Sequence, residues 1–184
     1  MEVVYYVAAS VDGFIATADG GVDWLSPFQG PDEDYGYGRF IAGIDVLLMG
    51  SRTYEQVLGF GAWPYEQPSV VFSSRLPASD VAGVEVTARA IGPVLEELAA
   101  GGHRRAWLVG GTALATSFRR LGRIDRYELF LMPRLLGRGV PLFEAIATSE
   151  DLLLEASKSY SNGVQHLRYG RRQSQSGTFS EKIP

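Results

Sequence analysis

Residues Ala106–Leu121 read AWLVGGTALATSFRRL, and this stretch decides the fold. It opens with a short apolar run that predicts a buried strand, and the pair Gly110-Gly111 predicts a turn. From Thr112 the apolar residues follow helical spacing as far as Leu121. A strand that passes through a glycine turn into a helix is the repeating unit of sheets whose parallel strands are joined by helices.

The same unit occurs earlier in the chain. Asp45–Met49 is an apolar run closed by Gly50, and Ser51–Leu58 then follows helical spacing. Ser69–Phe72 predicts a further strand, and Ile91–Ala100 predicts a helix that ends at a glycine pair. Alternating strands and helices predict an α/β fold of three layers, with a mainly parallel central sheet covered on both faces. Ligands of such sheets gather at the carboxyl ends of the strands.

Both ends of the chain add strands to this sheet. Val3–Ala9 is rich in β-branched and aromatic residues and predicts the first strand. Tyr127–Met132 predicts a strand, and Leu152–Tyr160 and Val164–Tyr169 predict two more that an Asn-Gly turn joins into an antiparallel C-terminal edge hairpin. Residues 171–184 are polar and lack periodicity, so we expect one domain over residues 1–170 followed by a polar tail.

Two segments after the first strand are less regular. Residues 16–31 are rich in glycine, aspartate and proline around Trp24, Leu25 and Phe28, which predicts a loop with aromatic anchors, suited to covering a site. Asp32–Ala42 predicts a helix, because its acidic first turn suits the positive end of a helix dipole.

The composition is that of a soluble globular protein. Hydrophobic residues make up 46% of the 184 residues and charged residues 21%, while the net charge of -4 gives no general attraction to nucleic acid. With no cysteine and only His103 and His166, we expect neither disulfides nor a dedicated metal site. The apolar start is too short for a membrane span and lacks the basic residues of a signal peptide. We therefore expect a cytoplasmic protein with no membrane partner.

Polar side chains and glycines follow three strands at the point where each strand ends. The segments are Gly50-Ser51-Arg52-Thr53, Ser73-Ser74-Arg75 and Val109-Gly110-Gly111-Thr112. Free N–H groups at a helix start hold phosphate, and hydroxyls with a guanidinium suit a phosphate monoester such as the 2′-phosphate of NADP. Each segment alone fits a tight turn, a helix cap or a solvated loop at least as well. Their occurrence at successive strand ends of one sheet favours a phosphate-binding surface.

The same segments carry a resemblance to a known family. Met49–Glu55 (MGSRTYE), Phe72–Arg75 (FSSR) and Gly110-Gly111 resemble, in order and spacing, the cofactor-binding segments of dihydrofolate reductases. Ser10–Ala16 (SVDGFIA) and Pro133–Phe143 (PRLLGRGVPLF) are more similar to the reductase domain of bacterial riboflavin biosynthesis and its stand-alone relatives. The resemblance covers about residues 2–170 and implies a dihydrofolate reductase-like fold.

The resemblance also implies an activity, namely hydride transfer from NADPH to a small heterocyclic substrate, pteridine- or pyrimidine-like, or to a carbonyl. The implied cofactor contacts are Ala9 and Ile15 for the nicotinamide, Leu114 beside the ring, Gly50, Ser51, Arg52, Thr53, Val109, Gly110, Gly111 and Thr112 for the pyrophosphate, and Ser73, Ser74 and Arg75 for the adenosine phosphate. Dihydrofolate reductases hold a catalytic carboxylate on the first helix. Among the acidic residues at that place, Asp34 is the candidate catalytic residue.

Several interpretations stay open. Asp12 and Trp24 are the candidate substrate-binding residues, although Asp12 fits a turn residue that caps its own loop better, and Trp24 fits core packing equally well. A nucleotide-binding or regulatory module without turnover is the rival function. A Rossmann dehydrogenase fits less well, because no GxGxxG follows the first strand. Relatives of this family commonly pair, so we expect a homodimer through the C-terminal strands and the Pro133–Phe143 segment.

Overall fold

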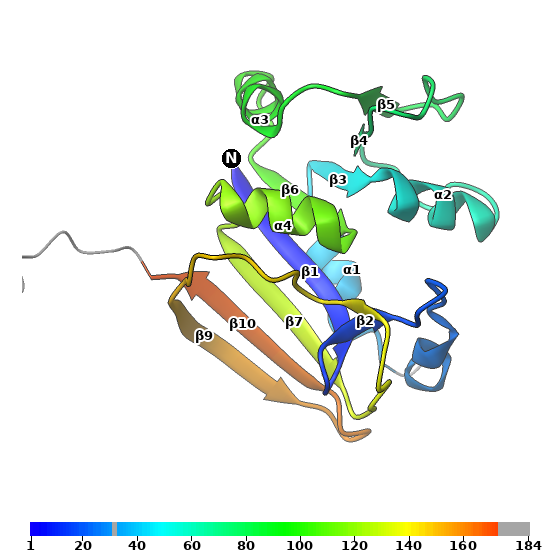
Figure 1. The fold of residues 1–184 in the computed structure, drawn as a ribbon, viewed down its shortest axis with the longest axis vertical. Helices are drawn as coiled ribbons and strands as arrows, with labels where there is room; N and C mark the ends of the chain where they lie inside the picture. Colours follow the sequence, from blue (N-terminus) through cyan, green and yellow to red (C-terminus); the bar gives the residue numbers. More distant parts are fainter. Residues whose placement is uncertain (31–32, 173–184) are drawn as a thin grey trace, which may run out of the picture.

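The structure is a computed structural model that describes residues 1–30 and 33–172. Within these residues the chain forms an eight-stranded sheet in the order β5-β4-β3-β6-β1-β7-β10-β9 (Figure 1). The strands are β1 (Glu2–Ser10), β3 (Val46–Gly50), β4 (Ser69–Phe72), β5 (Val84–Thr87), β6 (Arg105–Gly110), β7 (Arg126–Met132), β9 (Leu152–Ser159) and β10 (Gln165–Arg171). The six strands β5, β4, β3, β6, β1 and β7 run parallel to one another. β10 pairs antiparallel with both β7 and β9. The predicted α/β fold with an antiparallel C-terminal edge is confirmed.

Helices cover both faces of the sheet. They are α1 (Tyr37–Ile41), α2 (Ser51–Gly59), α3 (Ile91–Ala100) and α4 (Thr112–Arg120), and a 3-10 helix η1 spans Asp23–Phe28. Figure 1 shows α4 in front of β6 and β1, with α1 behind the sheet. Successive side chains of a strand point to opposite faces, so Val3 and Tyr5 pack with α3 and α4 while Val4 packs with α1 and α2.

The central strands are buried on both faces, which accounts for their continuous apolar sequence. The side chains of Val46, Leu47, Leu48 and Met49 on β3 have no exposed surface, and Leu108 on β6 has none either. A parallel strand between two helical layers must be apolar at every position, since neither face meets water. The sheet therefore provides a rigid base whose carboxyl edge holds the turns described below.

The structure differs from the sequence predictions in five places. β5 was not predicted, and neither was the small sheet that β2 (Phe14–Ala16) forms with β8 (Val140–Pro141). Part of the expected loop over residues 16–31 is the helix η1. The first helix begins only at Tyr37, because Gly36 has a φ of 82°, a left-handed conformation that ends the preceding turn. β10 ends at Arg171, two residues past the expected end of its strand at Tyr169 and one past the expected domain boundary at residue 170. Residues 173–184 of the expected tail lie outside the described residues.

Candidate functional site

Two glycine turns meet at the carboxyl edge of the sheet. β3 ends at Gly50 before α2, β6 ends at Gly110 before α4, and the two strands are neighbours. A Cβ atom placed on Gly50 would lie 3.7 Å from the Cβ of Leu114 and 3.8 Å from the backbone nitrogen of Gly111. A Cβ atom on Gly111 would lie 3.4 Å from Thr53 Oγ1. The structure thus brings together five predicted cofactor-binding residues at two adjacent turns, a group that we call the cradle: Gly50, Thr53, Gly110, Gly111 and Leu114.

The electrostatics of the cradle favour an anion. The N-terminal ends of α2 and α4 both lie there, and neither Gly50 nor Gly111 provides a side-chain cap. The first N–H groups of each helix therefore lack an intrahelical partner, and both helix dipoles present their positive ends. The hydroxyl of the buried Thr112 donates to the carbonyl oxygen of Pro141 at 2.6 Å, so this residue can offer a ligand only its backbone.

The Ser73-Ser74-Arg75 loop lies beside the start of α2. Arg75 Nη2 donates to Ser51 Oγ at 3.1 Å and forms an exposed ion pair with Glu55 Oε2 at 2.6 Å. Ser73 Oγ accepts the backbone N–H groups of Arg75 and Leu76 at 3.2 and 3.1 Å, which leaves its own proton free to donate. The loop is therefore positioned next to the cradle, although Glu55 competes for the guanidinium. Ser74 and Arg52 are exposed.

Three predicted cofactor residues lie further inside. Ala9 is fully buried, so only its backbone is available to a ligand. Ile15 is half-buried and packs against the core beneath α3 and α4. Val109 is half-buried as well and packs on the opposite face, with α1 and α2. The structure thus places the side chains of Ile15 and Val109 against the core on opposite faces of the sheet.

A cavity lies next to the cradle, at the carboxyl ends of β1 and β7 on the face that α1 covers. This cavity has a volume of about 340 Å³. It is lined by Tyr6, Ala8, Leu25, Phe28, Gln29, Gly30, Glu33, Asp34, Tyr35, Tyr37, Phe130 and Met132. Because β1 and β3 flank β6 in the sheet, the cavity and the cradle are neighbours along the same edge. This is the position at which open α/β sheets bind their ligands.

The cavity wall is held in place by contacts outside it. Phe130 stacks on His166 with ring centroids 4.2 Å apart, and the buried carboxylate of Glu128 holds His166 Nε2 at 2.5 Å and Arg168 Nε at 2.7 Å. Tyr35, with a φ of 54°, donates its hydroxyl to the carbonyl oxygen of Phe28 at 2.7 Å. A non-glycine residue in this conformation is strained, and such strain concentrates at functional sites.

The pKa values of two titratable groups in the cavity, Asp34 and Tyr6, are shifted in opposite directions. The carboxylate of Asp34 accepts the backbone N–H groups of Gly36 and Gly38 at 2.7 and 3.1 Å, which lowers the pKa of Asp34. Burial, reinforced by Tyr160 and Glu128, raises the pKa of the Tyr6 phenol. At neutral pH the cavity therefore contains an ionised carboxylate and a protonated phenol. The catalytic role of Asp34 stays a prediction, and its ionised state counts against it as a proton donor.

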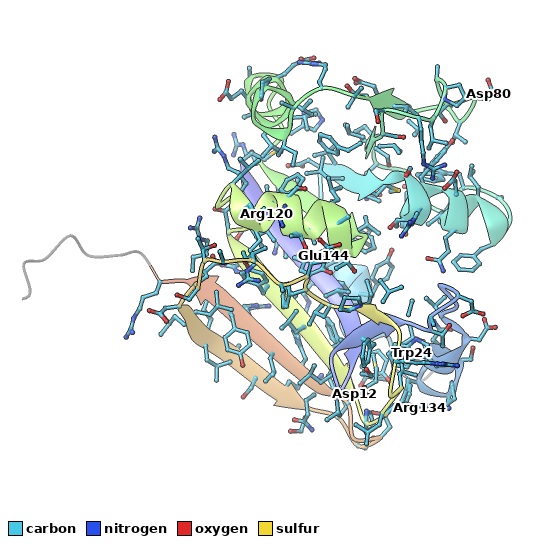
Figure 2. The ribbon with its side chains drawn as sticks, in the orientation of Figure 1. Asp12, Trp24, Asp80, Arg120, Arg134 and Glu144 are labelled. Atoms are coloured by element: carbon cyan, nitrogen blue, oxygen red, sulfur yellow. The ribbon has the colours of Figure 1, made fainter. Side chains whose placement is uncertain are left out.

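The side chains of the two predicted substrate-binding residues, Asp12 and Trp24, are engaged in contacts within the protein. Asp12 accepts Ser10 Oγ at 2.6 Å and the N–H groups of Leu136 and Gly137 at 3.1 and 2.6 Å, and these bonds lower its pKa, that from Ser10 most. Asp12 thereby joins the segments 10–16 and 133–143, the two that resemble riboflavin-pathway reductases. These segments meet near the labelled Asp12 and Arg134 in Figure 2. Trp24 is 6% exposed and packs with Phe130, Met132 and Tyr160 rather than lining the cavity.

The sequence analysis missed the cavity itself. Its aromatic rings come from β1, η1, the turn before α1, α1 itself and β7, and only the sheet topology brings these segments together. The density of aromatic residues between Trp24 and Phe40 was the available signal. Among residues 1–30 and 33–172 there is no cluster of three metal-ligating side chains. The same part of the chain has no helix long and apolar enough to cross a membrane.

The fold and the position of the site define the class of protein. The mainly parallel sheet with an antiparallel edge is that of dihydrofolate reductase-like proteins. The family model of the RibD C-terminal domain matches residues 2–166, and the chain belongs to this family. A reductase-like role is therefore supported at the level of the family.

Three similar proteins illustrate the relationship. The uncharacterized protein YwjB of Bacillus subtilis is 32% identical over 92% of this chain and 98% of its own. A solved structure from Shewanella sp. PV-4, of a protein assigned to riboflavin biosynthesis, has a TM-score of 0.87 at 28% identity and covers 94% of this chain and 100% of its own. A deaminase and 5-amino-6-(5-phosphoribosylamino)uracil reductase from Thermotoga maritima shares the fold, with a TM-score of 0.71 at 14% identity over 93% of this chain and 56% of its own.

Proposed function

We propose that this chain is an NADPH-dependent reductase that transfers a hydride to a small heterocyclic or carbonyl substrate. One observation carries the proposal, namely that an anion-favouring cradle and an aromatic cavity lie side by side at the carboxyl edge of one sheet. Reductases of this class need a place for the phosphates and, next to it, a place for the ring to be reduced.

The cradle fits the cofactor. The missing side chains at Gly50 and Gly111 leave backbone N–H groups open to an approaching pyrophosphate, and a Cβ at Gly111 would fill this space against Thr53 Oγ1. Ser73 and Arg75 are placed for a phosphate monoester, which supports a preference for NADPH over NADH. When bound, NADPH would supply the hydride.

The chain's own residues orient the substrate and keep water away. A ring bound against the aromatic wall would displace water from the cavity, which would strengthen electrostatic interactions with its polar groups. Burial raises the pKa of the Tyr6 phenol, which therefore stays protonated at neutral pH. A phenol with a raised pKa can donate a hydrogen bond to a bound ring but is a weak acid, and Asp34 is ionised, so we expect the proton for the reduced substrate to come from solvent.

Cofactor titration tests the proposed function. Calorimetry with NADPH and NADH should show at least tenfold tighter binding of NADPH. Turnover is then followed by the loss of NADPH absorbance in the presence of dihydropterins, aminopyrimidines and small carbonyls. Binding of NADPH without turnover of any substrate would instead support a nucleotide-binding regulatory module, and no binding of either cofactor would refute the proposal.

We also propose a homodimer that uses β9. Every residue of this edge strand is exposed, and Leu153 and Leu154 are 55% and 51% exposed. An unpaired edge with adjacent leucines suits pairing with a second copy, because pairing satisfies the open backbone groups and buries the apolar side chains. Light scattering should give twice the chain mass of 20.1 kDa. Leu153→Lys should give a monomer, and a parent protein that is monomeric at micromolar concentration would contradict the proposal.

A further inference from the structure

We propose that the cavity selects flat aromatic rings that carry no phosphate or other anionic group. As a statement about the substrate, this inference rests on the proposed function. As a statement about binding, it depends only on the cavity and can be tested without cofactor. It separates this chain from the Thermotoga maritima protein, whose described substrate is phosphoribosylated.

The shape and chemistry of the wall favour a flat ring. Five aromatic side chains line the cavity from different elements: Tyr6, Phe28, Tyr35, Tyr37 and Phe130. Their rings are already arranged against one another, with the centroids of Tyr6 and Phe130 4.7 Å apart and those of Tyr35 and Phe130 6.3 Å apart. An inserted ring can stack on these faces.

The charges around the cavity oppose an anion. Glu33 and Asp34 are the charged members of the lining, and no lysine or arginine joins them among the described residues. The hydrogen bonds that hold Asp34 ionised keep this negative charge at neutral pH. Arg168 and His166, behind Phe130, are both held by Glu128 and do not offset it. A phosphate in the cavity would meet like charge and no lysine or arginine among the described lining residues, while a neutral or cationic ring meets tyrosine faces.

A matched pair of ligands tests the inference. The probes are 1-naphthol and 1-naphthyl phosphate, which share one flat ring system and differ only in the phosphate. In calorimetric titrations without cofactor we expect 1-naphthol to bind at least tenfold more tightly. Gly111→Val serves as a second background, because it removes weak binding of the phosphate at the cradle without altering the cavity.

Three variants locate the binding. Phe28→Ala should weaken the binding of 1-naphthol at least fivefold. Phe60→Ala, at an exposed phenylalanine just after α2, should leave this binding unchanged. Asp34→Asn removes the charge and keeps one oxygen, which can accept one of the two N–H bonds. This variant should bind 1-naphthyl phosphate less weakly relative to 1-naphthol than the parent does. Melting temperatures establish that each variant is folded, and Tyr37→Ala replaces Phe28→Ala if that variant is not.

The outcomes are distinct from those of the cofactor titration. Equal or tighter binding of 1-naphthyl phosphate in the Gly111→Val background would overturn the inference, as would 1-naphthol binding that Phe28→Ala and Tyr37→Ala leave unchanged. Selective 1-naphthol binding by a protein that binds neither NADPH nor NADH would uphold the inference about the cavity and refute only the proposed function.

Discussion

Replacement of Gly111 by valine tests the cradle directly. Gly111 lacks the left-handed backbone of its neighbour Gly110, whose φ is 139°, so a side chain at position 111 is compatible with the backbone. The new Cβ would lie 3.4 Å from Thr53 Oγ1, a tight contact that a small shift relieves, and the valine methyl groups would occupy the space beyond it. The variant should therefore fold while the approach of a phosphate oxygen to hydrogen-bond distance is blocked.

The expected effect is large enough to measure by thermal melting. At a cofactor concentration of 100 times the dissociation constant, binding stabilises the parent by about 2.7 kcal/mol, which for a chain of this size raises the melting temperature by roughly 5–11 °C. A hundredfold weaker affinity reduces the stabilisation to about 0.4 kcal/mol, or roughly 1–2 °C. Gly59→Val, at the end of α2 with open space around it, is the matched control and should keep the parent's shift. A folded Gly111→Val protein with the full shift would show that these glycines are ordinary turn residues.

Two further predictions concern charged residues. Arg75→Ala should abolish the preference for NADPH over NADH. Glu55→Gln frees Arg75 from its ion pair and should strengthen the binding of NADPH severalfold. Calorimetry in which both variants bind the cofactors as the parent does would exclude the Ser73-Ser74-Arg75 loop from cofactor binding. Burial raises the pKa of Glu128, but hydrogen bonds from His166 and Arg168 outweigh burial and lower this pKa overall. Ionised Glu128 therefore stabilises the fold above the pKa that it has in the unfolded chain, and this stabilisation is lost as pH falls through the pKa that it has in the folded chain. Glu128→Gln should cost about 1–3 kcal/mol in urea unfolding at pH 7 and less at pH 3, and an equal loss at both pH values would contradict this assignment.

Local sequence patterns predicted the elements that are long or completely apolar. Ser69–Phe72 and Ile91–Ala100 have the bounds expected of them, because burial on a full face imposes a clear apolar pattern. β5 was missed because Val84–Thr87 is a short edge strand in which Glu85 is exposed, and an edge strand needs little apolar sequence. The expected helix from Asp32 was too long, since the left-handed turn at Gly36 outweighs the acidic residues before it.

One part of the candidate site could be predicted from local sequence, and the other part could not. The cradle was predictable because glycines at strand ends are a local signal, and parallel strands bring their ends to one edge. The cavity was not, because Tyr6 and Phe130 are far apart in sequence and meet only through the pairing of β1 with β7. The side chains of Asp12 and Thr112 are occupied by partners on the 133–143 segment, which no local pattern predicts.

The central position of β1 has a consequence for how the chain acquires its structure. β1 is made first, yet Glu2 pairs with Arg105 and Val4 pairs with Arg126, so neither neighbouring strand exists when β1 leaves the ribosome. At a synthesis rate of about 5–20 residues per second, β7 follows β1 by roughly 6–25 s. During this interval the apolar residues of β1 have no partner strand, and such distant pairings also slow folding. Refolding should therefore be sensitive to protein concentration, and a chaperone that shields apolar segments should raise the yield most while the chain is shorter than about 132 residues.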